Sequence, residues 1–267
     1  MILSYAASVI DTHCHLDTPA FDGDRADVVA RASAVGVVGM LVPAIRPKMW
    51  AGLVALCENH ATAGVRCALG VHPQIVPELA DDEVGGDLAE RIAEASRAAG
   101  VVAIGECGLD GATGERERQE QIFRAHVRAA RAVGLPLVVH VLRAHDVAPR
   151  ILREERAHEV GGVMHSYSGG ADLVRVYREL GMAFSFAGPV TYPNARKPLD
   201  AVRAIPSESL LAETDAPDQS PVPHQGERSE PAFVRHVLAG LAMARGASVE
   251  EISELTTANA RRIFRSW

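Results

Sequence analysis

The chain has 267 residues, of which 48% are hydrophobic and 23% charged, and its formal net charge is −7. This composition excludes a disordered, collagen-like or coiled-coil chain, and the acidic balance argues against a protein that coats nucleic acid by bulk electrostatics. None of the apolar runs approaches the roughly 20 residues that span a bilayer, and the apolar start, Met1 to Ile10, lacks the basic region of a signal peptide. We therefore expect a soluble, cytoplasmic protein with no membrane partner.

Short apolar runs alternate along the chain with longer segments of helical patterning. The eight expected strands are Val9–Ile10, Gly39–Val42, Cys67–Leu69, Val101–Ile104, Leu137–Val139, Gly162–Met164, Ala183–Phe186 and Leu210–Ala212. The expected helices between most of them are Asp24–Val35, Trp50–His60, Leu88–Ala98, Glu115–Val133, Ala171–Leu180 and Arg196–Ala204. This alternation is typical of parallel βαβ units in the α/β class.

Eight such units in about 250 residues predict a (β/α)8 TIM barrel. A doubly wound open sheet is the alternative, but it usually has a G-x-G-x-x-G motif after its first strand, which this sequence lacks. After the last expected strand, Ala216–Pro231 is a long loop rich in proline and polar residues, and two more helices, Pro231–Ala244 and Val249–Arg265, are expected. We expect residues 1–267 to form a single domain with these extra C-terminal helices.

The first chemical signal is the sequence D-T-H-C-H-L-D at residues 11–17. Residues two apart in a strand point to the same side, so His13 and His15 can converge on one ion just beyond the first strand. Imidazole nitrogens are standard ligands of zinc and similar divalent metals. By itself an H-x-H motif is weak, and two polar residues in a turn are the alternative interpretation.

Four further ionisable residues stand at the ends of other expected strands. The motif G-E-C-G-L-D comes directly after the fourth expected strand, and the carboxylate of its Glu106 can bridge two cations. Taken alone, it is equally an ordinary glutamate in a glycine-rich turn. His140 and His165 end the fifth and sixth strands, and Asp215 follows the eighth. Such groups can converge in a barrel mouth only if a cation or mutual pairing offsets their burial, which favours a metal site over isolated structural residues.

The motifs D-T-H-C-H-L-D, G-V-H-P, G-E-C-G-L-D, H-S-Y-S-G and E-T-D-A-P, with the strand-ending His140, have the order found in the TatD-type metal-dependent deoxyribonucleases. These enzymes belong to the amidohydrolase superfamily. The resemblance covers Asp11 to about Phe264, and the stretches V-P-A, T-Y-P and A-P-D are especially similar to the YjjV-like branch.

The resemblance implies a TIM barrel with two divalent metal ions at its mouth, for which Zn, Mn, Co and Mg are all candidates. Carried over by motif, His13, His15 and Asp215 would hold the first ion, His140 and His165 the second, and Glu106 would bridge the two. It also implies metal-dependent hydrolysis of DNA phosphodiester bonds, often as an exonuclease. The expected partner is therefore DNA, as a single strand or a strand end, and no protein partner is indicated.

The chain departs from the family pattern at two places. Family members commonly carry an arginine two positions after the fifth-strand histidine, where this chain has Leu142; the neighbouring Arg143 is the candidate replacement. In the last loop, Ser229 replaces the usual asparagine, and Arg228 is a candidate to orient a substrate phosphate or to fasten the loop; a surface arginine before a helix is the alternative interpretation. We expect His72 of G-V-H-P, Arg143 and Arg228 to contact the substrate, although His72 is equally placed to support the metal ligands.

These features predict hydrolysis in which Asp215 acts as the general base and Glu106 holds both ions. A hydrolase of a small ester, lactone or amide is the first alternative, because the acidic net charge and the scarcity of aromatic residues favour a short substrate. A non-catalytic metal-binding or interaction protein is the second, and the complete set of candidate ligands argues against it. Salt dependence separates a substrate with several phosphates from a neutral one.

Overall fold

The structure, a computed structural model, describes residues 7–267, so most of the apolar N-terminal stretch lies outside the described residues. All eight expected strands are present in a single parallel sheet, paired in the order of the chain. The strands are β1 (Val9–Asp11), β2 (Val37–Pro43), β3 (Val65–Leu69), β4 (Val101–Asp110), β5 (Leu137–Leu142), β6 (Gly162–Met164), β7 (Met182–Phe186) and β8 (Leu210–Ala212). In the described part of the chain, no helix is long and apolar enough to cross a membrane.

The sheet closes into a barrel through backbone contacts just beyond the ends of β1 and β8. The amide of Thr12 donates to the carbonyl of Ala212 at 3.1 Å, and the amide of Asp215 donates to the carbonyl of His13 at 2.9 Å. The TIM-barrel prediction is therefore confirmed, and the open doubly wound sheet is excluded. Because these bonds lie at the carboxyl ends of the strands, they also bring the H-x-H segment beside Asp215.

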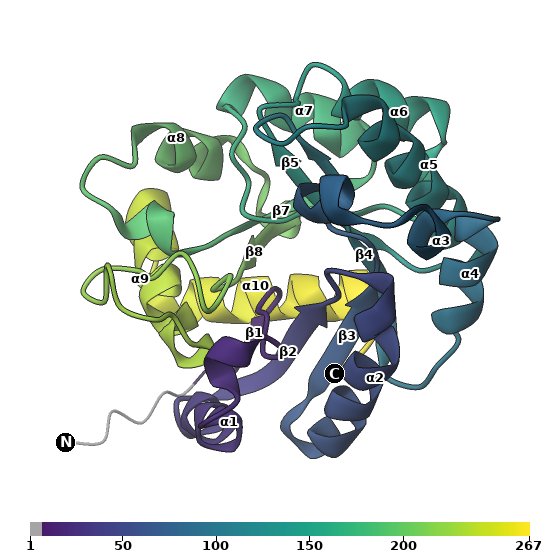
Figure 1. The fold of residues 1–267 in the computed structure, drawn as a ribbon. Coiled ribbons are helices and arrows are strands. Elements are labelled where there is room, and N and C mark those ends of the chain that lie inside the picture. The colour runs from purple at the N-terminus through teal and green to yellow at the C-terminus, as the bar shows by residue number, and fades with distance from the viewer. Residues whose placement is uncertain (1–6) are drawn as a thin grey trace.

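Helices alternate with the strands and surround the barrel (Figure 1). They are α1 (Arg25–Ala34), α2 (Trp50–Asn59), α3 (Asp81–Val84), α4 (Leu88–Ala95), α5 (Arg116–Val133), α6 (Ala148–Glu154), α7 (Ala171–Glu179), α8 (Arg196–Ala204), α9 (Val234–Arg245) and α10 (Val249–Phe264). Every expected helix is present, with ends that differ by no more than three residues. The short helices α3 and α6 were not expected; α6 carries Pro149 in its first turn, where proline is tolerated although it usually marks a break.

The strands β4 and β5 end at least three residues later than expected, which corrects the position of Glu106. Because β4 continues to Asp110, Glu106 lies within the strand and not directly after it, and β5 likewise continues past His140 to Leu142. Glycines obscure the strand pattern of β4, and the structure shows why they are there. Gly108 has φ 137°, and a side chain on it would collide with the carbonyl of His140 on the neighbouring strand.

Two hydrophobic clusters stabilise the barrel. The larger one fills the space between the sheet and the surrounding helices. The smaller one receives a side chain from every strand, and Ala260 and Phe264 of α10 pack against it. Helix α10 lies beside β1 and β8 in Figure 1 and closes the amino-terminal end of the barrel. The polar residues of the motifs therefore lie at the opposite end of the barrel, where the carboxyl ends of the strands meet.

Candidate active site

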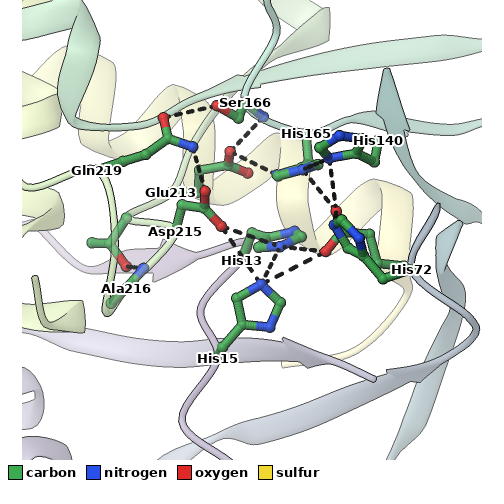
Figure 2. Close-up of polar contacts among 12 residues, drawn as sticks. His13, His15, His72, His140, His165, Ser166, Glu213, Asp215, Ala216 and Gln219 are labelled. Atoms are coloured by element: carbon green, nitrogen blue, oxygen red, sulfur yellow. Dashed lines mark hydrogen bonds and ion pairs between the residues drawn. The ribbon is translucent and has the colours of Figure 1, made fainter. Parts of the chain in front are cut away.

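The six candidate metal ligands converge at the carboxyl end of the barrel, from five different strands. His13 and His15 follow β1, Glu106 belongs to β4 and His140 to β5, His165 follows β6, and Asp215 follows β8. Figure 2 shows the histidines and Asp215 turned toward one another. The six candidate ligands, which the sequence places in separate motifs, thus form one cluster in space.

Glu106 is fully buried at the centre of this cluster, and its two carboxylate oxygens face different histidines. Oε2 lies 3.0 Å from His13 Nε2 and 3.7 Å from His15 Nε2. Oε1 lies 2.9 Å from His165 Nε2 and 3.1 Å from His140 Nδ1. Burial by itself would raise the pKa of Glu106, but the surrounding histidines lower it well below its usual value. A single carboxylate therefore joins two groups of ligands.

Asp215 completes the first group. Its Oδ1 lies 3.5 Å from His13 Nε2 and 3.6 Å from His15 Nε2. The residue has φ 55°, a left-handed conformation that aspartate tolerates better than most side chains. Burial raises the pKa of Asp215 to about 6. The side chain is therefore a carboxylate at neutral pH, yet a stronger base than an ordinary aspartate.

The donor atoms of this site fit divalent cations. Both oxygens of Glu106 are buried among imidazole nitrogens, and their burial is costly unless a positive charge lies beside them. Ring nitrogens also face each other in pairs, at 3.3 Å for His13 and His15 and at 3.1 Å for His140 and His165. Imidazole nitrogen mixed with carboxylate oxygen is a ligand set that suits Zn, Mn or Co.

Buried carboxylates that the sequence analysis did not single out lie behind these ligands. Asp110 Oδ2 is 3.4 Å from His140 Nε2, and Glu213 Oε1 is 3.4 Å from His165 Nδ1. Carboxylates in such positions orient a ligating imidazole and raise its basicity. The alternation of side chains along a strand could have indicated Asp110. This residue lies four positions after Glu106 and therefore on the same side of β4.

A hydrogen-bonded chain through Gln219 and Ser166 connects Asp215 of the first group with Glu213, which faces the second group (Figure 2). The amide nitrogen of Gln219 donates to Oδ2 of Asp215, and the hydroxyl of Ser166 donates to Gln219 Oε1 at 2.9 Å. The backbone amide of Ser166 donates to Glu213 Oε1 at 2.5 Å, and Glu213 faces His165. Neither residue was identified as a site residue from the sequence: Ser166 belongs to the H-S-Y-S-G motif but was given no role, and no motif distinguishes Gln219 from an ordinary loop residue.

His72 joins the second group as a hydrogen-bond donor. Its Nε2 lies 2.8 Å from Glu106 Oε1, while its Nδ1 accepts the backbone amide of Gln74 at 3.1 Å. Burial lowers the pKa of His72, so the ring is neutral. A neutral imidazole that accepts on Nδ1 carries its proton on Nε2. In this form His72 donates toward the site, and its ligand atom also lies close enough to those of Glu106 and His140 for the three residues to hold a metal ion.

The ligands line one side of a cavity of about 590 Å³, to which His15, His72, His140, His165 and Asp215 contribute. This volume is within the range of about 300–1,000 Å³ that is usual for small-molecule sites. The two arginines expected to contact the substrate are not part of this lining. His224, in the loop after β8, does not line the cavity either, and its ring is stacked on Phe233 with ring centroids 4.0 Å apart.

Arg143 and Arg228 differ in what surrounds them. Arg143 is exposed and follows the lining residue Leu142. Arg228 forms a two-pronged ion pair with Asp24, with distances of 2.8 Å and 2.7 Å, and its guanidinium lies 4.8 Å from the ring centroid of Phe21. Of the two roles considered for Arg228, the structure therefore shows the fastening of the last loop to the segment before α1.

Comparisons with known proteins find a family and relatives that match nearly the whole chain. A model of the TatD related DNase family matches residues 10–265. The uncharacterized metal-dependent hydrolase YabD of Bacillus subtilis is 35% identical over 260 residues, covering 96% of this chain and 99% of that protein. The uncharacterized metal-dependent hydrolase YjjV of Escherichia coli K12 is 34% identical over 261 residues, covering 96% of this chain and 97% of that protein.

Solved structures of TatD proteins are also similar to this chain. The crystal structure of the E. coli protein YjjV, described as a TatD homologue, matches with a TM-score of 0.88 and 33% identity, over 97% of this chain and 98% of that chain. A hydrolase of the TatD family from Entamoeba histolytica matches with a TM-score of 0.84, over 98% of this chain and 99% of that chain. At 19% identity the second likeness shows a shared fold.

Proposed function

Since this chain belongs to the TatD related DNase family and is a metal-dependent hydrolase, we propose that it cleaves DNA phosphodiester bonds, acting on a single strand or a strand end. The observation that carries the proposal is the position of Glu106. One buried carboxylate has an oxygen within 3.0 Å of a ring nitrogen in each of two histidine groups. Two metal ions in one site are a recurrent solution for displacing an oxygen at phosphorus.

The chain's own residues divide into two ligand groups. His13, His15 and Asp215 would hold one ion and His140 and His165 the other, with Glu106 contacting both. When bound, divalent cations supply Lewis acidity, which makes water a better nucleophile and phosphorus a better electrophile. Asp110 and Glu213 orient the imidazoles of the second group.

Asp215 is the general base of the proposed reaction. Its Oδ1 faces the histidines of the first group, and Gln219 holds the other oxygen. Asp215 takes a proton from the attacking water as a new P–O bond forms. The bond to the leaving oxygen breaks, and that oxygen receives the proton. A pKa raised to about 6 by burial suits a residue that accepts and then returns a proton near neutral pH.

Contacts to the substrate by His72, Arg143 and Arg228 stay predictions. Of the three residues, His72 has the strongest support for contact with the substrate. Its Nε2 proton points at the ligand cluster, where it can be donated to a phosphoryl oxygen. Arg143 is exposed beside the cavity. Arg228 would have to leave Asp24 to reach a phosphate.

The experiment is hydrolysis of a short single-stranded DNA, labelled at either end, by metal-stripped protein to which Mg, Mn, Co or Zn is restored singly. The Asp215→Asn variant is the control. Metal-dependent shortening from one end that is lost in the variant supports the proposal and ranks the metals. No cleavage by protein with its full complement of metal would overturn it.

A second candidate function is hydrolysis of a small ester, lactone or amide. One observation favours it: of the described residues, none that line the cavity is a lysine or an arginine. A panel of neutral esters, lactones and amides tested with the same metal-loaded protein decides between the two substrate classes.

A further inference from the structure

We propose that His145 is a positioning residue for the second group of metal ligands. Through the hydroxyl of Ser168, it holds the loop that carries His165 against the end of β5, which carries His140. This inference rests on the two-ion arrangement of the proposed function and adds a residue from outside the ligand set. Two features carry it: the point at which the pairing of β5 and β6 ends, and a chain of three hydrogen bonds that continues the connection.

The parallel pairing of β5 and β6 ends just where the ligands begin. The last paired residues are Val139 and Met164, and the amide of His165 then donates to the carbonyl of Val139 at 3.0 Å. Carbonyl groups two positions apart on a strand face the same neighbour, so the next carbonyl on this edge belongs to Val141. Because β6 ends at Met164, it has no strand residue left for this carbonyl, and another group must bond it.

Ser168 provides this bond. It lies in the loop between β6 and α7, three residues after His165, and its hydroxyl donates to the carbonyl of Val141 at 2.9 Å. The bond joins the loop to the end of β5 on either side of the two ligands. Nδ1 of His140 and Nε2 of His165 lie 3.1 Å apart, and both must face the same ion. The relative position of these two nitrogens therefore depends on where Ser168 is held.

His145 fixes the direction of this hydroxyl. It lies in the loop between β5 and α6, where its Nε2 is 3.2 Å from Ser168 Oγ and its Nδ1 is 2.8 Å from the hydroxyl oxygen of Tyr177. Since the serine proton is engaged by the carbonyl of Val141, Nε2 is the donor to Oγ, and Nδ1 accepts from the tyrosine. Burial lowers the pKa of His145 to about 4, which agrees with a neutral ring that carries a single proton.

Tyr177 anchors this chain of hydrogen bonds in the core. Its side chain is fully buried on α7, and the ring of His145 meets the rings of Tyr167 and Tyr177 edge-on, with centroids 6.1 Å and 5.7 Å apart. Without the tyrosine hydroxyl, His145 is free to carry its proton on Nδ1 and to accept from Ser168 on Nε2. The serine proton would then leave the carbonyl of Val141, and the loop would lose its bond to β5.

The test is metal binding. Metal-stripped protein is titrated with Co²⁺, and binding is followed by calorimetry and by the visible spectrum of the cobalt. We expect two ions in the wild type. In His145→Phe and Ser168→Ala the ion of the second group should bind about 10- to 100-fold more weakly, and that of the first group should change by less than about threefold. Anomalous scattering from cobalt in crystals of each variant shows which ligand group has lost its ion.

Tyr177→Phe is the mildest variant, because it removes one oxygen from the chain and keeps the packing of the ring. We expect it to weaken the ion of the second group about three- to tenfold, as for one lost hydrogen bond. Tyr192→Phe is the matched control. Its hydroxyl donates to the carbonyl of Ser220 in another loop, so its loss should leave the affinity for the second ion unchanged.

A residue that only stabilises the fold would give a different result. It would lower the temperature of unfolding of the metal-free protein and weaken both ions alike. Equal weakening of the two ions, or unchanged binding of the second ion in both Ser168→Ala and Tyr177→Phe, overturns the inference.

The same measurement is independent of the nuclease proposal, because it contains no DNA. If the second ion responds as expected but no DNA is cleaved, the nuclease proposal fails and the role of His145 stands. If DNA is cleaved but the second ion binds to the variants as it does to the wild type, the role of His145 is wrong. A wild type that binds a single ion would overturn the two-ion arrangement and this inference together.

Discussion

Gln219 holds one oxygen of Asp215. Its amide donates to Oδ2, and this leaves Oδ1 directed at His13 and His15. The amide keeps this orientation because a flipped amide would set its oxygen against the carboxylate oxygen of Asp215, and the hydroxyl of Ser166 donates to its oxygen on the other side. A residue of the long loop after β8 therefore sets the direction in which the proposed general base points.

This contact predicts the effect of removing the amide. Gln219→Met keeps the length of the side chain but not the donor, so Asp215 is free to rotate. We expect kcat to fall about 10- to 100-fold, as for other partners that orient a ligand, with little change in KM. Steady-state kinetics of Gln219→Met and Ser166→Ala test this, and kinetics within twofold of the wild type in both variants would contradict it.

Glu106 is expected to be indispensable for metal binding. In Glu106→Gln the amide nitrogen replaces one of two oxygens that each face a histidine group, so one group loses its shared anionic ligand. We expect metal analysis to find about two ions per wild-type chain and one or none in the variant, with activity lost in parallel. Full activity with the second group of ligands empty would rule out the two-metal arrangement.

The pair between Arg228 and Asp24 distinguishes two roles for the arginine. If Arg228 acts by fastening the last loop, Asp24→Ala should reproduce the effect of Arg228→Ala on KM and kcat, because either change breaks the same pair. If Arg228 contacts a phosphate, only Arg228→Ala should raise KM for DNA. We expect the two variants to agree within about threefold, and a difference of tenfold or more assigns the arginine to the substrate.

His126 predicts a loss of stability in mild acid. It is fully buried on α5, its Nε2 accepts the backbone amide of Val71 at 2.9 Å, and its Nδ1 lies 2.7 Å from the carbonyl of Ile122. Burial lowers its pKa from 6.5 to about 4, so between these values the unfolded chain binds a proton that the folded protein excludes. Stability is therefore complete above pH 6.5 and falls as the pH approaches 4, by roughly 3 kcal/mol from this group.

Denaturant unfolding at several pH values measures this dependence, and His126→Gln is the matched variant because it lacks a titrating group. The difference in free energy of unfolding between the two proteins should shrink as the pH falls from 6.5 to 4. His145, whose pKa is also lowered to about 4, acts in the same direction in both proteins and cancels. A difference that stays constant over this range would contradict the prediction.

Much of the barrel could be predicted because its signals are local. An apolar run followed by a helical segment predicts a strand and its crossover wherever it occurs, and this pattern identified all eight strands. The predicted end of β4 was wrong because Gly105 and Gly108 look like a turn, whereas in the folded protein they let the strand pass close to β5. Helix α6 was missed because Pro149 and its short length weaken the pattern.

The sequence by itself also determined which residue types gather at the mouth. Parallel strands in a barrel have their carboxyl ends on one side, so His13, Glu106, His165 and Asp215 had to approach each other once each was placed at a strand end. Only the tertiary structure decided how they divide: which oxygen of Glu106 faces which histidines, that His72 donates, and that Gln219 holds Asp215. These relationships depend on atoms from segments far apart in the chain meeting at hydrogen-bond distance, and no local pattern encodes that. The same holds for Arg228, whose partner Asp24 lies at the other end of the sequence and is brought to it only by closure of the barrel.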